Sequence, residues 1–405
     1  MTALSKFLNF FYQRIIKRTI PHTLVSWRFF VPMGWADLNM SAYKLHKKVF
    51  LQAWPQIPRS LYVFGVIYSL LVWYFIWGPW FYTRHLIKRR CSKSVDQPST
   101  GLTFLHYMKQ SFFAYLRGLA PVSFSSLNFA ELARNDWWAY VPNQVLPHWH
   151  MVLQEGYSKR SSAIISSKLE FAQAMAQAGL AVIPTEKVTS DTVVELAAGP
   201  ALFFKPEISS QAKGCLIIEW TECGEAHLRS KDGKTQRKGL TAIRSYLNEA
   251  LCSTSYLKQP KLVSHPDLTP FYDNHDLVVI RIVTLRTAKG FRAWRANLEL
   301  PVLNQVFVKP YAIDVTDGRV GELDNFTLPC WADLVVLAIR AHAEVADLKS
   351  VGWDVALTDE GPILIEGNLN WGTSVLQTQG RGGLVDGDYL DMVSCAGLPQ
   401  HSPSV

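Results

Sequence analysis

The pattern of apolar and polar positions changes along this chain near residue 160. From residue 161 onward, short apolar runs typical of strands alternate with helical patterns at about 238–253 and 330–348. Residues 102–160 are rich in aromatic side chains and predict a helical lead-in, while the polar segment 91–101 is typical of a linker. The pattern predicts an α+β (mixed α/β) architecture of two or three units, because domains usually contain about 100–200 residues.

One stretch near the N-terminus is apolar without interruption. Residues 61–82 contain no charged side chain, and a helix of this length could cross a hydrocarbon core of about 30 Å. Basic residues flank the stretch on both sides, with a cluster at Arg84, Lys88, Arg89 and Arg90. We therefore expect a transmembrane or re-entrant anchor at 59–90, followed by a cytoplasmic domain. A bend at Gly78-Pro79 favours the re-entrant form, and a buried core helix is a further alternative.

The first 58 residues predict a basic amphipathic region that associates with a membrane. One helical face gathers Leu4, Phe7, Leu8, Phe11 and Ile15. The first 95 residues carry fourteen Lys or Arg and one acid, Asp37, so the rest of the chain has a net charge of −5 against a total of +8. The basic character therefore belongs to the N-terminal part. We expect membrane lipids as its partners, no nucleic acid, and a location at the inner or plasma membrane.

The six cysteines form neither a CxxC pair nor a zinc-binding pattern. Reduced thiols agree with a domain that works in the cytoplasm.

The segment GWDVALTDEGPILIEGN predicts a β-hairpin with a cluster of oxygen ligands. Turn residues from Thr358 to Pro362 separate two β-rich runs, so a hairpin centred near Glu360 would bring Asp354 opposite Glu366. Asn368 would share their face, because side chains alternate along a strand. Magnesium prefers one or two carboxylates together with phosphate and water oxygens. An exposed acidic hairpin without metal is the alternative.

Two lysines stand where a nucleotide-binding fold would need them. Lys205 follows an apolar run and precedes a loop of small residues that includes Ser209, Ser210 and Gly214, so backbone amides and a cation could contact phosphate oxygens there. An ordinary hairpin with a solvated lysine is the alternative. Lys168 opens a helical pattern that ends at Gly179.

A buried strand is predicted over residues 276–286, interrupted by Arg281. A guanidinium in such a run is costly to bury without an anionic partner. The partner is either a protein carboxylate or a phosphoryl group, whose oxygens match the planar fork of arginine.

Taken together, these segments resemble the ATP-grasp superfamily, and within it the sugar-transfer-associated branch related to alpha-L-glutamate ligases and hexapeptide-transferase-like proteins. The resemblance runs from about Ser161 to Gly397 and is most specific in GWDVALTDEGPILIEGNLNWG. Weaker matches occur in SKLEFAQAMAQAGLAVIPTEKV, LFFKPEISSQAKGCLIIE, YLKQPKLVSHPDLTPF and DLVVIRIVTLR. The resemblance implies an ATP-grasp domain at 161–397, with two α+β subdomains that clamp ATP, and a tail at 398–405.

The resemblance also implies roles for individual residues. ATP would be contacted by Lys168, Lys205, Ser209, Ser210, Gly214, Gln259 and Arg281, of which Lys205 and Arg281 would act in catalysis. Magnesium, or manganese in its place, would be held by Asp354, Glu366 and Asn368. The chain departs from the family in two places, because no acid follows Gln259 at the adenine hinge and the segment 300–307 lacks the usual loop. Asn304 and Lys309 are the candidates for the acceptor side.

The activity implied is that of a membrane-anchored, ATP-dependent carboxylate–amine ligase that forms an acyl phosphate. The resemblance points to carboxylate and amine substrates, sugar- or lipid-linked, in the biosynthesis of polysaccharides or glycoconjugates. Two alternatives stay open. One is a kinase of the same fold that transfers phosphate without joining an amine, and the other is a membrane scaffold with a degenerate nucleotide site.

Overall fold

The computed structural model describes two compact units of the chain. The described residues are 40–53, 104–116, 138–141, 149–150 and 156–394, with gaps at 190–195, 197–198, 208–213, 232, 273–275, 302–307, 324–325, 374 and 378–380, and single positions at 60, 67, 71, 75, 79 and 82. One unit comprises 1–155 with 372–390, and the other comprises 156–371 with 391–405.

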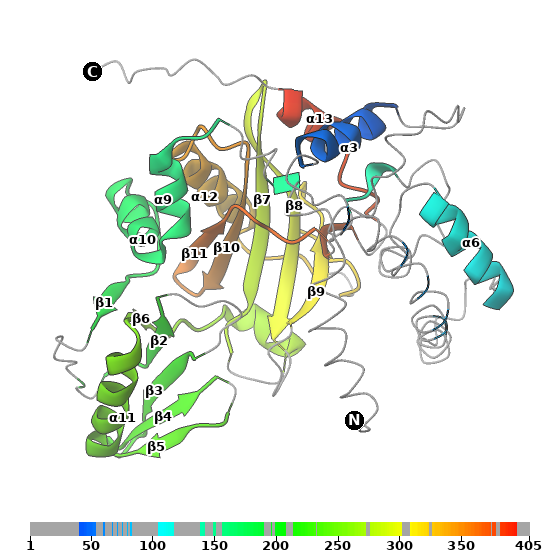
Figure 1. Ribbon diagram of the computed structural model, residues 1–405. Coiled ribbons are helices and arrows are strands. Elements are labelled where there is room, and N and C mark those ends of the chain that lie inside the picture. The colour runs from blue at the N-terminus through cyan, green and yellow to red at the C-terminus, as the bar shows by residue number, and fades with distance from the viewer. Residues whose placement is uncertain are drawn as a thin grey trace, which may run out of the picture. The chain divides into compact units, whose positions relative to one another are not determined.

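The larger sheet of the second unit has five antiparallel strands. Its order is β11-β10-β7-β8-β9 (Figure 1), and the strands are β7 (Val279–Thr287), β8 (Gly290–Pro301), β9 (Val308–Ile313), β10 (Ser350–Thr358) and β11 (Gly361–Asn368). Three helices cover one face: α9 (Lys159–Ser166), α10 (Lys168–Gln177) and α12 (Trp331–Ala343). Apolar side chains from the strands and helices form the main core there, including Ile280, Ile282, Ala296, Leu334, Ala338 and Trp353.

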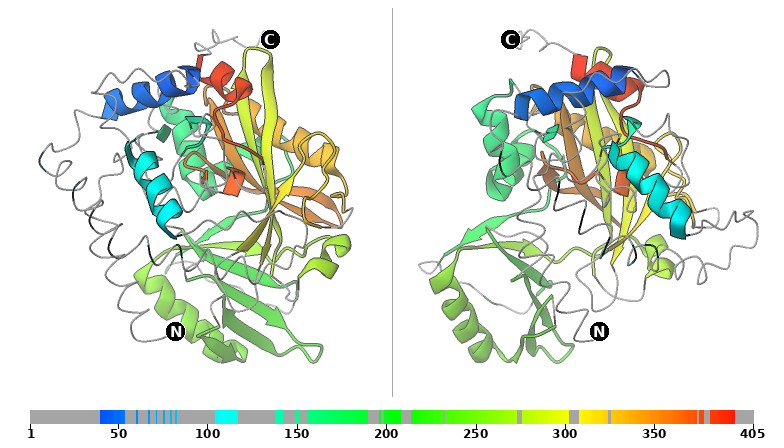
Figure 2. Two further views of the ribbon diagram at one scale, coloured as in Figure 1. Left: turned by 90° about the vertical axis from the view of Figure 1, so that its right-hand side faces the viewer. Right: turned by 45° about the vertical axis from the view of Figure 1, so that its right-hand side comes forward.

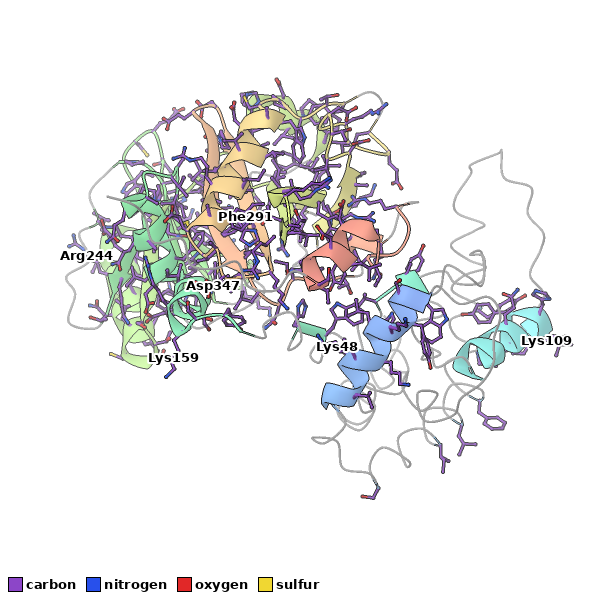
Figure 3. All side chains as sticks on the ribbon, turned by 90° about the horizontal axis from the view of Figure 1, so that it is seen from above. Lys48, Lys109, Lys159, Arg244, Phe291 and Asp347 are labelled. Carbon is purple, nitrogen blue, oxygen red and sulfur yellow. The ribbon has the colours of Figure 1, made fainter. Side chains whose placement is uncertain are left out.

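A buried polar chain ties α12 to this sheet. The Trp353 indole Nε1 donates to the Thr284 hydroxyl at 2.7 Å, and that hydroxyl lies 2.8 Å from Nδ1 of His342. The other ring nitrogen of His342 lies 3.0 Å from the carbonyl oxygen of Leu348. The ring of Phe291 on β8 (Figure 3) packs against that imidazole, with 4.6 Å between the ring centroids. Burial lowers the pKa of His342 to about 4, so the ring is neutral at neutral pH.

One carboxylate fixes the start of α9. Asp347, which follows α12 in the chain (Figure 3), accepts hydrogen bonds from the backbone N–H of Ser158 and from the hydroxyl of Ser161. The Ser158 side chain in turn caps the helix by accepting from the backbone N–H of Ser161 at 3.1 Å. Helix α9 is therefore held at its first turn by a residue almost two hundred positions further along.

The smaller sheet of the same unit has six antiparallel strands in the order β1-β6-β2-β3-β4-β5 (Figures 1 and 2). They are β1 (Glu186–Val188), β2 (Leu202–Pro206), β3 (Leu216–Trp220), β4 (Ala226–Ser230), β5 (Gln236–Lys238) and β6 (Tyr256–Pro260). Helix α11 (Leu240–Ser253) packs Ile243 and Leu247 against Phe204 and Ile218 on one face. Since side chains alternate along a strand, Lys205 points from the opposite face.

The first unit gathers a cluster of aromatic side chains around α3 (Met40–Ala53). His46 on this helix lies 3.0 Å from the carbonyl oxygen of Trp138, and its ring centroid is 4.8 Å from that of Trp149. Trp149 donates to the hydroxyl of Tyr389 in α13 (Gly387–Ser394). Burial lowers the pKa of His46 to about 4. These contacts join distant parts of the chain into one core.

The mixed α+β architecture and the helices predicted at 238–253 and 330–348 are confirmed by α11 and α12. Of the six cysteines, the four within the described residues are free thiols at 215, 223, 252 and 330.

The predicted membrane location is wrong for the part of the chain that the structure describes. No described helix combines the length and the apolar character that crossing a membrane requires. Helices α3 and α6 (Phe104–Leu116) have 14 and 13 residues. At about 1.5 Å per residue, each is about 20 Å long, which is shorter than a hydrocarbon core of about 30 Å. The predicted anchor at 59–90 lies outside the described residues except for single positions, and the amphipathic face at residues 4–15 lies wholly outside them.

Candidate active site

A row of polar side chains crosses the larger sheet on the face away from α12. Glu366 on β11 is paired with Asp354 on β10, Asp354 with Arg281 on β7, and Arg281 with Asn297 on β8. Directly paired residues on neighbouring strands point to the same face of a sheet. The chain neighbours of Asp354, Arg281 and Asn297 point the other way, into the core under α12. Glu366, Asp354, Arg281 and Asn297 are called the polar row below.

The hairpin predicted at the acidic end of the row is confirmed. Strands β10 and β11 pair as expected, with Asp354 opposite Glu366 and a turn at Asp359 and Glu360. Nδ2 of Asn368 lies 3.5 Å from Oδ2 of Asp354 and 3.4 Å from Oε1 of Glu366. Three oxygen-bearing side chains therefore meet at one end of the hairpin.

Arg281 finds its anionic partner within the protein. Its Nη2 donates to Oδ2 of Asp354 at 3.0 Å, and its Nε donates to Oδ1 of the same carboxylate. Only 21% of the Arg281 side chain and 11% of the Asp354 side chain are exposed, so water screens this pair weakly. The sequence left two possible partners for Arg281, a protein carboxylate and a phosphoryl group. In the structure, Arg281 is paired with a protein carboxylate.

The charges in the row shift one another's titration. Burial raises the pKa of Asp354, Arg281 opposes this effect, and the nearby Glu366 and Glu299 carboxylates add to it, which leaves the pKa at about 7. Burial acts to lower the pKa of Arg281, but the carboxylates of Asp354, Glu299 and Glu366 raise it overall. On this face of the larger sheet, three carboxylates therefore act on the one guanidinium of Arg281.

The oxygen ligands at the hairpin fit a magnesium ion. In the part of the chain that the structure describes, no group of three or more His, Cys, Asp or Glu side chains could hold a metal by itself. Two carboxylates and an amide suit magnesium nevertheless, since it binds one or two protein carboxylates and completes its shell with phosphate and water oxygens. Burial and the Glu366 carboxylate both raise the pKa of Asp354, and a cation held at the hairpin would offset both effects.

Lys205 brings a positive charge from the smaller sheet to the same place. Only 7% of this residue is exposed, and burial lowers its pKa, while the Glu366 and Asp354 carboxylates oppose that shift. The charge of Lys168 lowers the pKa of Lys205 further, so this second lysine is also within electrostatic reach. Lys205 is therefore within electrostatic reach of the acidic end of the polar row, and Lys168 is within reach of Lys205.

Lys168 is the first residue of α10, as the helical pattern predicted. The side chain of the N-cap residue, Ser167, accepts a hydrogen bond from the backbone N–H of Glu170 at 3.2 Å. This capping bond satisfies one of the free N–H groups at the helix start and fixes where the helix begins. The cap therefore determines the position of the lysine next to it.

The loop after Lys205 is described only at its end. Ser209 and Ser210 lie outside the described residues. Gly214 has φ of +74°, and a Cβ placed on it would lie 3.0 Å from the ring of Pro206. Glycine is therefore required there for two reasons, its backbone conformation and the close approach of the proline.

The predicted adenine hinge holds Gln259, which is 3% exposed and donates to the Thr185 hydroxyl at 2.8 Å. Gln259 is paired with Phe203, so it shares the sheet face of Lys205. No acid follows Gln259 in the sequence, but an acid on β3 lies nearby, because Nζ of Lys261 is 2.6 Å from Oε1 of Glu219. The pairing of Phe203 with Ile217 puts Glu219 on this same face.

Two residues of the site were missed in the sequence. Asn297 and Glu299 alternate with core residues along β8, and the alternation in RANLELP was the signal that could have revealed them. Of the two predicted acceptor-side residues, Asn304 lies outside the described residues. Lys309 is paired with Leu300, a core residue, so it belongs to the opposite sheet face from Asn297.

An acidic hairpin with an arginine and two lysines from other elements is the arrangement that the resemblance to ATP-grasp proteins implied. Residues 318–388 match the family model described as "Sugar-transfer associated ATP-grasp", which confirms the resemblance seen in the sequence. The matched segment contains Asp354, Glu366 and Asn368, while Lys168, Lys205 and Arg281 precede it.

Solved structures of ATP-grasp enzymes are similar to this chain at low identity. An N5-carboxyaminoimidazole synthetase from Staphylococcus aureus complexed with ADP is 8% identical, covers 63% of this chain and 59% of its own, and gives a TM-score of 0.40. The D-alanine-D-alanine ligase from Coxiella burnetii is 12% identical, with 52% and 50% covered and a TM-score of 0.32. The ATP-grasp ligase PsnB, complexed with minimal precursor, Mg and ADP, is 16% identical, with 65% and 64% covered and a TM-score of 0.32.

The chain thus spans about half to two thirds of the length of these structures. No curated protein matches it.

Proposed function

We propose that this protein is an ATP-dependent ligase that joins a carboxylate to an amine through an acyl phosphate. One observation carries the proposal: cations from two sheets, Lys205 and Arg281, meet the Asp354 and Glu366 carboxylates at one place. That arrangement suits phosphoryl transfer, where a protein acts mainly by positioning and by neutralising charge. The family-model match over the acidic hairpin adds support.

The nucleotide is bound by residues of the smaller sheet and the start of α10. Lys168 and Lys205 bind phosphate oxygens of ATP, since the two cations are within electrostatic reach of each other and Lys205 is within reach of the acidic end of the polar row. The loop that contains Ser209, Ser210 and Gly214 helps them with its backbone amides, and Gln259 contacts the base.

The larger sheet supplies the metal ligands and the cation at the reacting group. Asp354, Glu366 and Asn368 hold Mg²⁺, which when bound neutralises phosphate charge and orients the triphosphate. Arg281 orients the Asp354 carboxylate through its two hydrogen bonds and directs the remaining positive charge toward the transferred phosphoryl group.

The chemistry takes two steps. A carboxylate oxygen of the first substrate attacks the γ-phosphorus of ATP, the bond from that phosphorus to the β,γ-bridging oxygen breaks, and ADP leaves. The amine nitrogen of the second substrate then attacks the acyl carbon, the bond to the phosphate oxygen breaks, and inorganic phosphate leaves as the nitrogen loses a proton. The products are an amide, ADP and phosphate. The family description favours a carboxylate borne by a sugar or sugar derivative.

Two assays on the full chain test this function. The first measures ATP binding by calorimetry with and without Mg²⁺, in the wild type, in Glu366→Gln and in Glu360→Gln. Glu360 makes the matched control, because it belongs to the same hairpin but is exposed at the turn. We expect magnesium-dependent binding in the wild type and the control, and its loss in Glu366→Gln.

The second assay separates a ligase from a kinase. Hydroxylamine attacks an acyl phosphate to give a hydroxamate, which forms a coloured iron complex, whereas the phosphate ester made by a kinase does not react. Amino acids and uronic acids serve as carboxylates, with MgATP. ATP-dependent hydroxamate supports the ligase. ADP formation without hydroxamate would favour the kinase, and a folded protein that binds no ATP would refute both activities.

A further inference from the structure

Strand β8 carries polar side chains beyond Arg281, on the side of the row away from the acidic hairpin. Asn297 is paired with Arg281 on one side and with Ala312 on the other. Only 1% of Asn297 is exposed, and its Oδ1 accepts no hydrogen bond within the described part of the chain. The row thus ends in a buried acceptor that lacks a donor.

Such an acceptor is rare in a folded protein, because an unsatisfied buried polar atom costs free energy. No described residue around Asn297 on this face supplies the donor, although Arg295, two residues earlier on β8, shares the face. Ala312 and Pro310 on β9 have no side-chain donor, and the Arg281 guanidinium is engaged with Asp354. A ligand with an N–H or O–H group would complete the site.

A second acid stands next to this acceptor. Glu299 is two residues beyond Asn297 on β8, so both side chains point to the same face. Glu299 is half-buried, and its charge acts on both Arg281 and Asp354, which means that it lies within electrostatic reach of the row. No salt bridge to Glu299 occurs among the described residues. The carboxylate therefore favours a donor that carries positive charge.

We propose that Asn297 and Glu299 bind the ammonium group of the amine substrate, which passes one proton to the Glu299 carboxylate before the free amine attacks. This proposal rests on the proposed ligase function and deepens it by naming a cationic amine as the acceptor. The order of strands supports it, because neighbouring strands are about 4.8 Å apart. Three groups then follow one another across the sheet: the phosphates at β10 and β11, the reacting carboxylate near β7, and the amine at β8. Arg281 lies between the two substrates.

Binding of a small cation tests the proposal without catalysis. Glycinamide is the probe, and acetamide, which lacks the ammonium group, is its matched control. Calorimetry or ligand-observed NMR on the full chain would measure both in the presence of Mg²⁺ and a non-hydrolysable ATP analogue. The variants are Glu299→Gln and Asn297→Leu, with Glu360→Gln as the control for a lost acidic charge elsewhere on the sheet.

The expected result is selective binding of glycinamide by the wild type and by Glu360→Gln, with at least a tenfold weaker affinity in each of the other two variants. Asn297→Leu should also melt at the same or a higher temperature than the wild type, because leucine removes the unsatisfied acceptor. A purely structural role for Asn297 would instead lower the melting temperature.

Two results would overturn the proposal. One is a wild type that binds glycinamide no better than acetamide, and the other is an unchanged glycinamide affinity in Glu299→Gln. The ligase function is judged separately, by magnesium-dependent ATP binding and hydroxamate formation in the wild type. A wild type that passes those tests but ignores glycinamide refutes only the ammonium site.

Discussion

Replacing Arg281 with methionine would measure the role of its ion pair with Asp354. Methionine keeps most of the side-chain length and removes the charge and both hydrogen bonds. In the wild type, the guanidinium acts against burial and against the neighbouring carboxylates, and the pKa of Asp354 lies at about 7. Without Arg281, burial and the neighbouring carboxylates act unopposed, so the pKa of Asp354 should rise further.

The size of the effect follows from proton linkage. The pKa of Asp354 is about 7 in the folded protein against an ordinary value of 3.8, so the folded state binds more protons between these pH values and its stability falls as pH rises through them. This loss ends near pH 7 in the wild type but continues above pH 7 in Arg281→Met, at about 1.4 kcal/mol per pH unit. At pH 6 the Asp354 carboxyl is protonated, so Arg281→Met leaves no buried charge without a partner. The substitution should therefore lower the free energy of unfolding by less than the roughly 3–5 kcal/mol that an unpaired buried charge costs.

Urea denaturation of the full chain at pH 6, 7 and 8, with a chelator present, would give the free energies of unfolding. The difference between wild type and Arg281→Met should grow by about 1 kcal/mol from pH 7 to pH 8, because the wild type still loses part of its Asp354 proton over this range. In Arg281→Met/Asp354→Asn this extra dependence on pH should vanish, because the amide does not titrate. A difference of equal size at pH 6 and pH 8 would refute the reasoning.

Three further predictions concern other parts of the second unit. The pKa of His342 is lowered to about 4 from 6.5, so the unfolded chain takes up the proton first as pH falls between these two values. The free energy of unfolding should therefore fall by about 3 kcal/mol over this pH range. Urea denaturation of His342→Gln should show a smaller fall, and a fall equal to that of the wild type would contradict the assignment to His342. Lys205→Met should weaken MgATP binding at least tenfold, about 1.4 kcal/mol, in calorimetry, while the exposed control Lys289→Met leaves it unchanged. Gly214→Ala should lower the free energy of unfolding by about 1–2 kcal/mol. Gly233→Ala should lower it less, because Gly233 has a similar positive φ but open space around its Cβ. Equal losses of stability in the two variants would show that the contact with the Pro206 ring is irrelevant.

The acidic hairpin shows how much of the site could be predicted from local sequence. Turn residues between two β-rich runs determine which positions face each other, so the pairing of Asp354 with Glu366 followed from the segment alone. The helix start at Lys168 was equally local, because it depends on the capping residue next to it.

Other parts of the site depend on contacts between distant segments. The partner of Arg281 could not be chosen from the sequence, since Asp354 is 73 positions away and meets it only through the pairing of β7 with β10. Likewise, the acid that pairs with Lys261 could not be found next to Gln259, because Glu219 comes from β3, 42 positions before Lys261. In both pairs, the two residues are far apart in the sequence, and the order of the strands brings them into contact.

The predicted membrane location is not borne out by the described residues. The described helices of the first unit are too short to span a hydrocarbon core.

By itself, the sequence determined the elements and chemical groups of this protein: strands that alternate with helices, an acidic hairpin, one lysine at a strand end, another at a helix start, and a buried arginine. These features depend on local periodicity and turn chemistry, which a short segment expresses without the rest of the chain. Only the tertiary structure decided that Glu366, Asp354, Arg281 and Asn297 form one row and that Lys205 reaches it from another sheet. Strand register and order arise from packing the whole core, because shifting a strand by one residue would turn its polar side chains to the opposite face.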